Sequence, residues 1–350
     1  MKKWTGWLVV LGVLLLVGCG QNDSGGAKTN NTKSSNASAE LKVKKGEYAV
    51  LPKVTEEGQN TLVLNVQVKN KGKKKIYMTS ENFSLYEKGK DEKIKAEDVY
   101  SSDLDLSPFD YGTLSAGKSM SGDIIFNIDP KKEYELSFST MTSDGDGQDV
   151  QVAIDKDKFK KSKDALNDAE KAGQAFIDVL FLGKDNVNYD KFVANQKGQT
   201  QEEISKIYKD INEDGLFYST DLNDEGYKTA LDLFIKAQGK RSKITIETEE
   251  QVGDNAELAV DIDEGLNNDE ISDLFSDYSE TYLESTDDYD SEKASQYAFS
   301  KFKDILNQVE LKSSRSELKL KLVKEDGKWK IDPKEEENEQ TIKALLGNFY

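Results

Sequence analysis

The spacing of apolar residues changes once along this chain, and that change limits the folds open to it. Over residues 41–155, apolar side chains recur at every second position, as at Leu62, Leu64 and Val66, and turns separate the runs. Short runs with a period of two predict an antiparallel β-sandwich. Near Phe159 the period becomes 3.6, which predicts helices. The sequence therefore indicates two successive domains of different class.

The first of these domains carries a family resemblance in one segment. Residues 114–126 read Leu-Ser-Ala-Gly-Lys-Ser-Met-Ser-Gly-Asp-Ile-Ile-Phe. This resembles the strand-turn-strand of the immunoglobulin-like domains of unknown function found in Gram-positive lipoproteins. The resemblance implies an immunoglobulin-like sandwich. Its motif consists of turn and core positions, so it informs on fold and hardly on ligand.

The same segment overlaps a nucleotide-binding pattern. Residues 112–119 satisfy the P-loop spacing, which requires a helix immediately after the glycines. The residues that follow, 120–128, alternate instead as a strand. We therefore expect the glycines to form turns, and we expect no nucleotide to bind.

The second half of the chain predicts helices around two antiparallel strand pairs, an α+β domain. We expect helices over 166–180, 200–208, 227–239, 271–283 and 293–306, strands at 243–249, 257–263 and 318–322, and a final amphipathic stretch at 342–349. Residues 200–203, Thr-Gln-Glu-Glu, predict a capping box at one helix start. Asp326-Gly327 predicts the turn of a hairpin that returns through Trp329 and Ile331.

This order of elements, with the terminal Gly-Lys-Trp-Lys-Ile-Asp hairpin at 327–332, resembles a lipoprotein domain family. The family is the uncharacterised carboxy-terminal domain of Gram-positive lipoproteins, related in outline to the nuclear transport factor 2-like and cystatin-like cone. Such cones can hold a ligand pocket between sheet and helices. We expect apolar side chains to fill this one instead.

The amino terminus has the parts of a lipoprotein signal sequence. Two lysines precede an apolar run, residues 7–17, that is short for a membrane span and has the length of a secretion signal. Residues 16–19, Leu-Val-Gly-Cys, resemble the lipobox of bacterial lipoproteins at every position. The resemblance implies cleavage between Gly18 and Cys19 and acyl chains, such as palmitate, carried by Cys19. The alternative is an ordinary secretory signal or a short anchor with an incidental cysteine.

A polar segment follows the lipobox. Residues 20–40 are mainly Asn, Ser, Gly, Thr and Lys, so they lack the apolar surface needed to fold. We expect a disordered tether there with a root-mean-square reach of roughly 25 Å. The expected organisation is a signal peptide, a lipidated tether, a sandwich and an α+β domain at residues 1–18, 19–40, 41–157 and 158–350.

Composition excludes several kinds of chemistry. The chain has no histidine and one cysteine, so Ser-His and Cys-His pairs, disulfides and His/Cys zinc sites are excluded once Cys19 is acylated. Without residues 1–18 the chain keeps 46 basic and 66 acidic residues, a formal charge of −20. This sign disfavours nucleic acid and predicts repulsion from an anionic membrane or wall polymer. Residues 244–292 hold 18 acids and no lysine or arginine, which indicates a solvated surface or a docking face for a basic partner.

One acidic run matches a metal-binding pattern. Residues 210–221 place oxygen-bearing side chains at positions 1, 3, 5 and 12 and glycine at 6, and resemble a dockerin or EF-hand calcium loop. The run departs from that pattern because position 12 is Asp rather than Glu and no second copy follows. The candidate ligands are Asp210, Asn212, Asp214, the carbonyl of Leu216, and Asp221. A polar loop between helices is the alternative, so calcium is a candidate cofactor and none is required.

These observations predict a lipid-anchored protein on the extracytoplasmic face of the bacterial cell membrane, bound to the membrane through its N-terminal acyl chains. The leading expected function is non-catalytic, an envelope binding or interaction module whose partner is an envelope protein or a wall polymer. One alternative is a solute- or ligand-capture lipoprotein that uses a pocket in the C-terminal domain. A further alternative is a carboxylate-based hydrolase.

Overall fold

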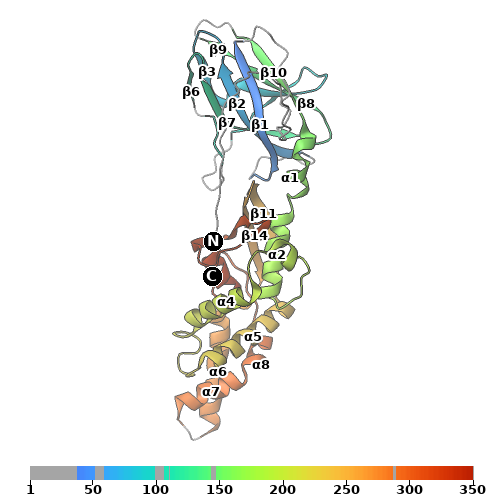
Figure 1. Cartoon of the computed structure of the whole chain (residues 1–350). Helices are drawn as coiled ribbons and strands as arrows, with labels where there is room; N and C mark the ends of the chain where they lie inside the picture. The colour runs from blue at the N-terminus through green and yellow to red at the C-terminus, as the bar shows by residue number, and fades with distance from the viewer. Residues whose placement is uncertain are drawn as a thin grey trace, which may run out of the picture. The chain divides into compact units, whose positions relative to one another are not determined.

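A sandwich of antiparallel strands is followed by a region of helices and antiparallel sheet, and this confirms the predicted fold class (Figure 1). The computed structural model describes residues 38–51, 59–98, 106–109, 111–142, 147–286 and 289–349. No helix within these ranges is both long and apolar enough to cross a bilayer. The predicted signal peptide, the Gly18–Cys19 cleavage site and tether residues 19–37 lie outside the described residues.

The sandwich strands pair into two larger sheets, β1–β2–β7 and β10–β8–β4–β5, and a short third sheet, β6–β3–β9. A 3₁₀ turn, η1 (Ser80–Asn82), precedes β4, and a second, η2 (Lys156–Phe159), follows β10. The strands are β1 (Ala39–Ala49), β2 (Asn60–Asn70), β3 (Ile76–Met78), β4 (Phe83–Glu87), β5 (Lys93–Lys95), β6 (Gly112–Leu114), β7 (Ser119–Ile128), β8 (Tyr134–Ser139), β9 (Met141–Thr142) and β10 (Asp149–Ile154).

The alternation predicted for the sandwich is confirmed in its central strands. Leu62, Leu64, Val66 and Val68 of β2 have no exposed surface, and Phe126 of the neighbouring β7 has none either. Successive side chains of a strand point to opposite faces of the sheet, so residues two apart share the core face. The period-two pattern therefore identified the buried face of these strands.

Two predicted turns are also confirmed. Gly117, between β6 and β7, has a φ of 75°, so the run that mimics a P-loop is a strand, a turn and a second strand. Asp326 and Gly327 have φ values of 49° and 83° and join the strands β13 (Leu318–Glu325) and β14 (Lys328–Lys330). A two-residue turn of this hand matches the twist of a hairpin and favours Asp-Gly.

The C-terminal region contains one antiparallel sheet in the order β11–β12–β13–β14, with helices around it. Its other strands are β11 (Lys243–Val252) and β12 (Asn255–Glu264). The helices are α1 (Lys160–Asp164), α2 (Asp168–Leu180), α3 (Tyr189–Phe192), α4 (Lys197–Asn212), α5 (Asp224–Arg241), α6 (Asn268–Ser285), α7 (Ser291–Ser300), α8 (Phe302–Gln308) and α9 (Glu336–Leu345). The described residues from 38 to 349 belong to one compact unit, and the predicted boundary between residues 157 and 158 stays a prediction.

Apolar side chains fill the space between this sheet and its helices, as expected from the sequence. Leu258 and Leu320 of the sheet and Trp329 of β14 have no exposed surface. Helix α2 lies close to β12 because Gly173 faces Leu258, and a Cβ at that glycine would overlap the leucine side chain. The interior of the cone-like region is therefore a packed core.

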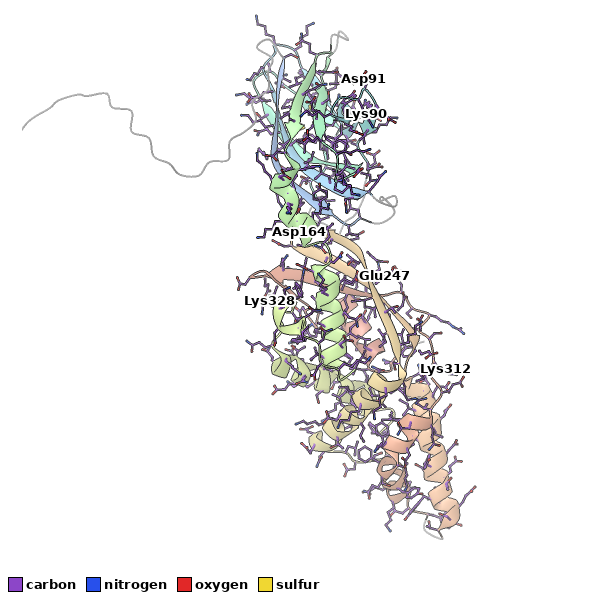
Figure 2. The ribbon with its side chains drawn as sticks, turned by 90° about the vertical axis from the view of Figure 1, so that its right-hand side faces the viewer. Lys90, Asp91, Asp164, Glu247, Lys312 and Lys328 are labelled. Carbon is purple, nitrogen blue, oxygen red and sulfur yellow. The ribbon has the colours of Figure 1, made fainter. Side chains whose placement is uncertain are left out.

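Charged side chains lie on the outside of both regions, as Lys90 on the sandwich and Glu247 on β11 illustrate (Figure 2). Among the described residues, Glu257 is the one charged residue with less than 9% of its surface exposed. Its carboxylate accepts a hydrogen bond from Lys319 at 2.7 Å, and two further glutamates lie within 3.3 Å of the same ammonium group. These partners raise the pKa of Lys319, the hydrogen bond from Glu257 most of all.

Two predicted helix boundaries are wrong. Helix α4 begins at Lys197, and Thr200 lies inside it with its hydroxyl donating to the Gln196 carbonyl at 3.0 Å, so no capping box forms at Thr200. The single helix predicted over 293–306 is divided into α7 and α8. The Lys301 amide donates to the Ala298 carbonyl at 2.9 Å, three residues back, which tightens the last turn and ends α7.

The loop between α4 and α5 is fixed by one aromatic side chain. Phe217 is 1% exposed, and its ring centroid lies 5.3–5.9 Å from those of Tyr227, Phe275, Phe299 and Phe302. These partners come from α5, α6, α7 and α8, and each meets Phe217 edge-on, the geometry that aromatic quadrupoles favour. The loop is therefore tied to four helices through a single ring.

This arrangement predicts a large stability difference between two adjacent aromatic residues. Phe217→Ala should lower the free energy of unfolding by about 3–5 kcal/mol, because it leaves a cavity among the rings. Tyr218→Ala is the matched control, since Tyr218 is 77% exposed and should change stability by about 0.5 kcal/mol or less. Denaturation followed through Trp329, the single tryptophan after residue 18, measures both. Equal losses in the two variants would contradict the role assigned to Phe217.

Candidate functional site

Helices α4 and α5 pack side by side through aromatic and aliphatic residues and leave a groove along their outer side. Tyr208 of α4 and Phe234 of α5 are buried with ring centroids 5.7 Å apart. The turn into α5 is capped by Asn223, whose side-chain oxygen accepts from the Gly226 amide at 2.9 Å. The period-3.6 stripes on both helices bring these residues together, because each helix must bury its apolar face.

The groove has an apolar floor and a charged rim. Its volume is about 890 Å³. The floor is formed by Leu180, Ile204, Tyr227, Leu231 and Ile235. The rim carries six carboxylates and three ammonium groups from Glu202, Asp210, Glu213, Asp224, Glu225, Asp232, Lys206, Lys209 and Lys228. The rim therefore has an excess of negative charge above an apolar surface.

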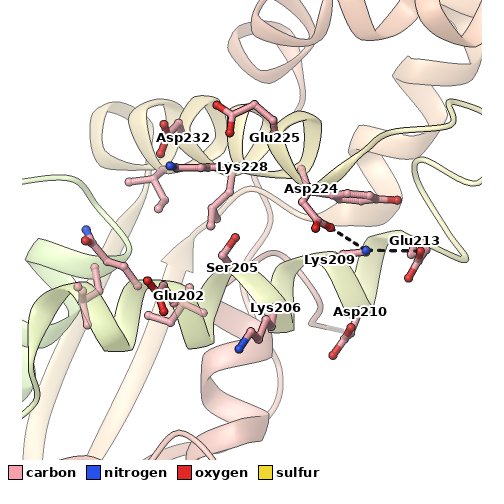
Figure 3. Close-up of a pocket in the computed structure, with 17 residues that line it drawn as sticks. Glu202, Ser205, Lys206, Lys209, Asp210, Glu213, Asp224, Glu225, Lys228 and Asp232 are labelled. Carbon is pink, nitrogen blue, oxygen red and sulfur yellow. Dashed lines mark hydrogen bonds and ion pairs between the residues drawn. The ribbon is translucent and has the colours of Figure 1, made fainter.

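One lysine at the rim is already neutralised by its neighbours. The Lys209 ammonium lies 3.0 Å from Asp224 and 3.9 Å from Glu213 (Figure 3). It also lies 5.5 Å from the ring centroid of Tyr227. The hydrogen bond to Asp224 is the main cause that raises the pKa of Lys209, and burial raises the pKa of Tyr227. Both groups are therefore protonated at neutral pH, and Lys209 donates a hydrogen bond to Asp224.

The two faces of α4 have different roles in this arrangement. Figure 3 shows Ser205 on the side of α4 that faces α5, while Lys206 and Asp210 point away from α5. The side chain of Lys228 lies alongside α5, with its nitrogen beside Asp232. A partner lying along the groove would meet the Ser205 side of α4.

The structure does not gather the candidate calcium ligands into an EF-hand loop. Helix α4 continues through Asn212, so Asp210 and Asn212 stand about 200° apart around a helix axis rather than converging. Asn212 is buried and its side-chain amide donates to the Tyr208 carbonyl at 2.8 Å. Leu216, which precedes Phe217, is buried, and Asp214 is exposed.

The remaining candidate, Asp221, is exposed with a φ of 46°, and it lies four residues beyond buried Phe217. The expected loop conformation is wrong because α4 continues through Asn212, the third position of the expected loop. Across the described ranges, no group of three or more acidic or other metal-binding side chains is placed to hold an ion.

Sequence reasoning found both groove helices and missed the groove. The apolar stripes predicted the buried face of each helix, through Ile204 and Tyr208 on one and Tyr227 and Leu231 on the other. They do not predict which rim residues of the two helices lie opposite one another. The available signal was the concentration of acids that flanks both stripes.

Comparisons with known proteins place this architecture in a family. Residues 159–346 match the family described as "Domain of unknown function (DUF5105)". The chain belongs to the DUF5105 family. Residues 26–150 match "Domain of unknown function (DUF4352)", so the predicted succession of two uncharacterised lipoprotein-type domains is confirmed.

One relative, matched both by its sequence and by its crystal structure, extends the likeness to nearly the whole chain. The Uncharacterized lipoprotein YcdA of Bacillus subtilis (strain 168) is 26% identical over 362 residues, which cover 99% of this chain and 98% of YcdA. The crystal structure of YcdA from Bacillus subtilis subsp. subtilis str. 168 matches with a TM-score of 0.62 and 23% identity, over 91% of this chain and 97% of that one. At this identity the structural likeness shows the fold alone.

The helical path through Asp210 and Asn212 makes a prediction about calcium. Calorimetric titration up to about millimolar calcium should give no saturable heat, because binding would require the last turn of α4 to unwind. The variant Asp210→Ala should behave like the parent. A one-site isotherm that is lost in Asp210→Ala and kept in Asp185→Ala, an exposed control, would contradict this prediction.

Proposed function

We propose that this protein is acylated on Cys19 and held on the extracytoplasmic face of the membrane, where it binds an envelope protein without catalysing a reaction. The lipobox supports the anchor, and the alignment with an uncharacterised lipoprotein covers 99% of the chain. The α4–α5 groove supports the binding role. The partner we propose is an amphipathic segment with lysine or arginine beside apolar residues.

The observation that carries the binding role is the pairing of an apolar floor with an acidic rim. Apolar side chains of a partner would be removed from water on Leu231 and Ile235, and its basic groups would face rim carboxylates such as those of Glu202 and Asp232. A wall polymer rich in phosphate would meet repulsion at the same rim. The charge of the groove therefore favours a basic protein segment over a polyanion.

The alternatives gain less support from the structure. A ligand-capture role inside the cone would need space that Leu258, Leu320 and Trp329 fill. A carboxylate-based hydrolase needs an acid whose pKa is raised by burial, whereas rim acids such as Glu202 and Asp232 are exposed.

The anchor is tested by fractionation. In the bacterial host, Cys19→Ser should move the protein from the membrane fraction to the soluble fraction, because no acyl chain can then attach. Gly20→Ser, next to the cysteine, leaves the acceptor in place and should stay with the membrane. Retention of Cys19→Ser in membranes that withstands high salt would rule out the proposed anchor.

The groove is tested with a synthetic helical peptide that has leucines on one face and lysines on the other. Fluorescence anisotropy should show binding that weakens about tenfold in Glu202→Lys/Asp232→Lys, because two attractions become repulsions. The matched control is Glu170→Lys/Asp185→Lys, which makes the same charge change at exposed residues outside the groove. Equal losses in both double variants would mean that only net charge matters, and the groove assignment would fail.

A further inference from the structure

The described chain enters the sandwich at the turn between β2 and β3. Ser38 is the first described residue, and its carbonyl accepts hydrogen bonds from the backbone amides of Lys71 at 2.8 Å and Gly72 at 2.9 Å. Eighteen residues separate Ser38 from Cys19 in the sequence. The segment that leads to the proposed lipid anchor therefore leaves the sandwich at this turn.

A buried asparagine holds this turn against the neighbouring turn of the sandwich. Asn70 has no exposed surface, and its side-chain amide donates to the carbonyls of Lys74 and Leu114, both at 2.8 Å. Its backbone amide donates to the Lys118 carbonyl at 2.9 Å, and its carbonyl accepts from Gly117 at 2.9 Å. Residues 70–76 and 115–118 are thus fixed side by side.

Lysines surround these two turns and form what we call the lysine end. Residues 69–75 contain five lysines and no acid. All six side chains of the lysine end are exposed, namely Lys69, Lys71, Lys73, Lys74, Lys75 and Lys118. The whole chain has a formal charge of −18, so the positive charge of the lysine end is opposite in sign to the net charge.

Of the described acids, Glu40 forms an ion pair with a lysine of this group. Glu40 lies 2.7 Å from Lys71 and 2.8 Å from Lys42, and these hydrogen-bonded lysines lower the pKa of Glu40 to about 2. Asp144 and Asp146 are near in sequence to β9 but lie outside the described residues. Glu40 therefore offsets one of the six positive charges, and the lysine end keeps an excess of positive charge among the described residues.

An exposed aromatic face adjoins the lysine end. On the short sheet β6–β3–β9, Tyr77 pairs with Thr113 on one side and with Met141 on the other (Figure 1). Tyr77, Met141 and Tyr111 are 37%, 59% and 83% exposed. They are three of the seven large apolar or aromatic side chains that are exposed in the described ranges; Tyr77 and Met141 lie on this sheet, and Tyr111 directly precedes β6.

We propose that the lysine end and the Tyr77 face bind the anionic phospholipid surface of the membrane. Tyrosines favour the headgroup level of a bilayer, and each lysine near an anionic surface strengthens binding about fivefold. The eighteen-residue connection to Cys19 cannot extend beyond about 65 Å, so this surface stays near the lipid whenever the anchor is in place. The rest of the chain is acidic and is repelled, which orients the sandwich with the lysine end toward the membrane.

Vesicle sedimentation tests this without the anchor. The chain from residue 19 on, carrying Cys19→Ser, should sediment with vesicles of phosphatidylglycerol and phosphatidylcholine and should be released when salt rises from about 0.1 M to about 0.5 M. It should not sediment with phosphatidylcholine alone. Because no acyl chain is present, failure here leaves the proposed Cys19 anchor unaffected.

Charge reversal locates the binding surface. Lys73→Glu/Lys75→Glu/Lys118→Glu should weaken partitioning by about tenfold or more, whereas the control Lys93→Glu/Lys95→Glu/Lys131→Glu, with the same charge change, should alter it by about twofold or less. The six lysines substituted in these two triple variants are exposed, and circular dichroism checks that each variant is folded.

Tyr77→Ser/Met141→Ser should weaken binding by a factor that salt does not change, because it removes apolar rather than charged contact. Absence of vesicle binding by the parent, equal losses in the two triple variants, or sedimentation with a purified anionic wall polymer in place of vesicles would each overturn the proposal.

Discussion

Burial of apolar side chains in two cores holds this protein together, because its single cysteine precludes any disulfide within the chain. In the sandwich, β2 contributes Leu62 and Leu64 to a core that includes Phe126 of β7. In the C-terminal region, Trp329 and Leu258 belong to one continuous apolar cluster with the helices. Every surface that could meet a partner is positioned by these cores.

The clearest case is the loop between α4 and α5. Burial of Phe217 among four rings directs the loop inward, and Asp224 then stands at the start of α5, where it pairs with Lys209. Helix α4 continues through Asn212, so Asp210 and Asn212 do not converge as the pattern of a calcium loop would require.

Charge is distributed unevenly over this acidic chain, and both proposed binding surfaces depend on that distribution. The lysine end holds positive charge at the turn where the chain from Cys19 enters the sandwich. The α4–α5 groove holds negative charge above an apolar floor. A net charge of −18 describes neither surface, and for that reason the sequence predicted general repulsion from an anionic membrane.

Sequence patterns succeeded where burial follows from local periodicity and failed where it depends on contacts between distant segments. Alternation predicted the core face of β2, and Asp326-Gly327 predicted the hairpin turn, because both depend on local backbone geometry. The start of α4 was misplaced because Thr200 favours a cap locally and bonds within the helix instead. The groove was missed because its opposing faces come from two helices whose pairing no single segment encodes.

Photo-crosslinking on intact cells tests the proposed binding role most directly. A photoreactive amino acid at position 205, on the groove side of α4, should form an adduct with one envelope protein (Figure 3). The adduct should disappear when Glu202→Lys/Asp232→Lys is added, and position 187, where Val187 is 93% exposed, should give no such adduct. Adduct formation from position 187 but not from position 205, or an adduct at 205 that survives the charge reversal, would contradict the account.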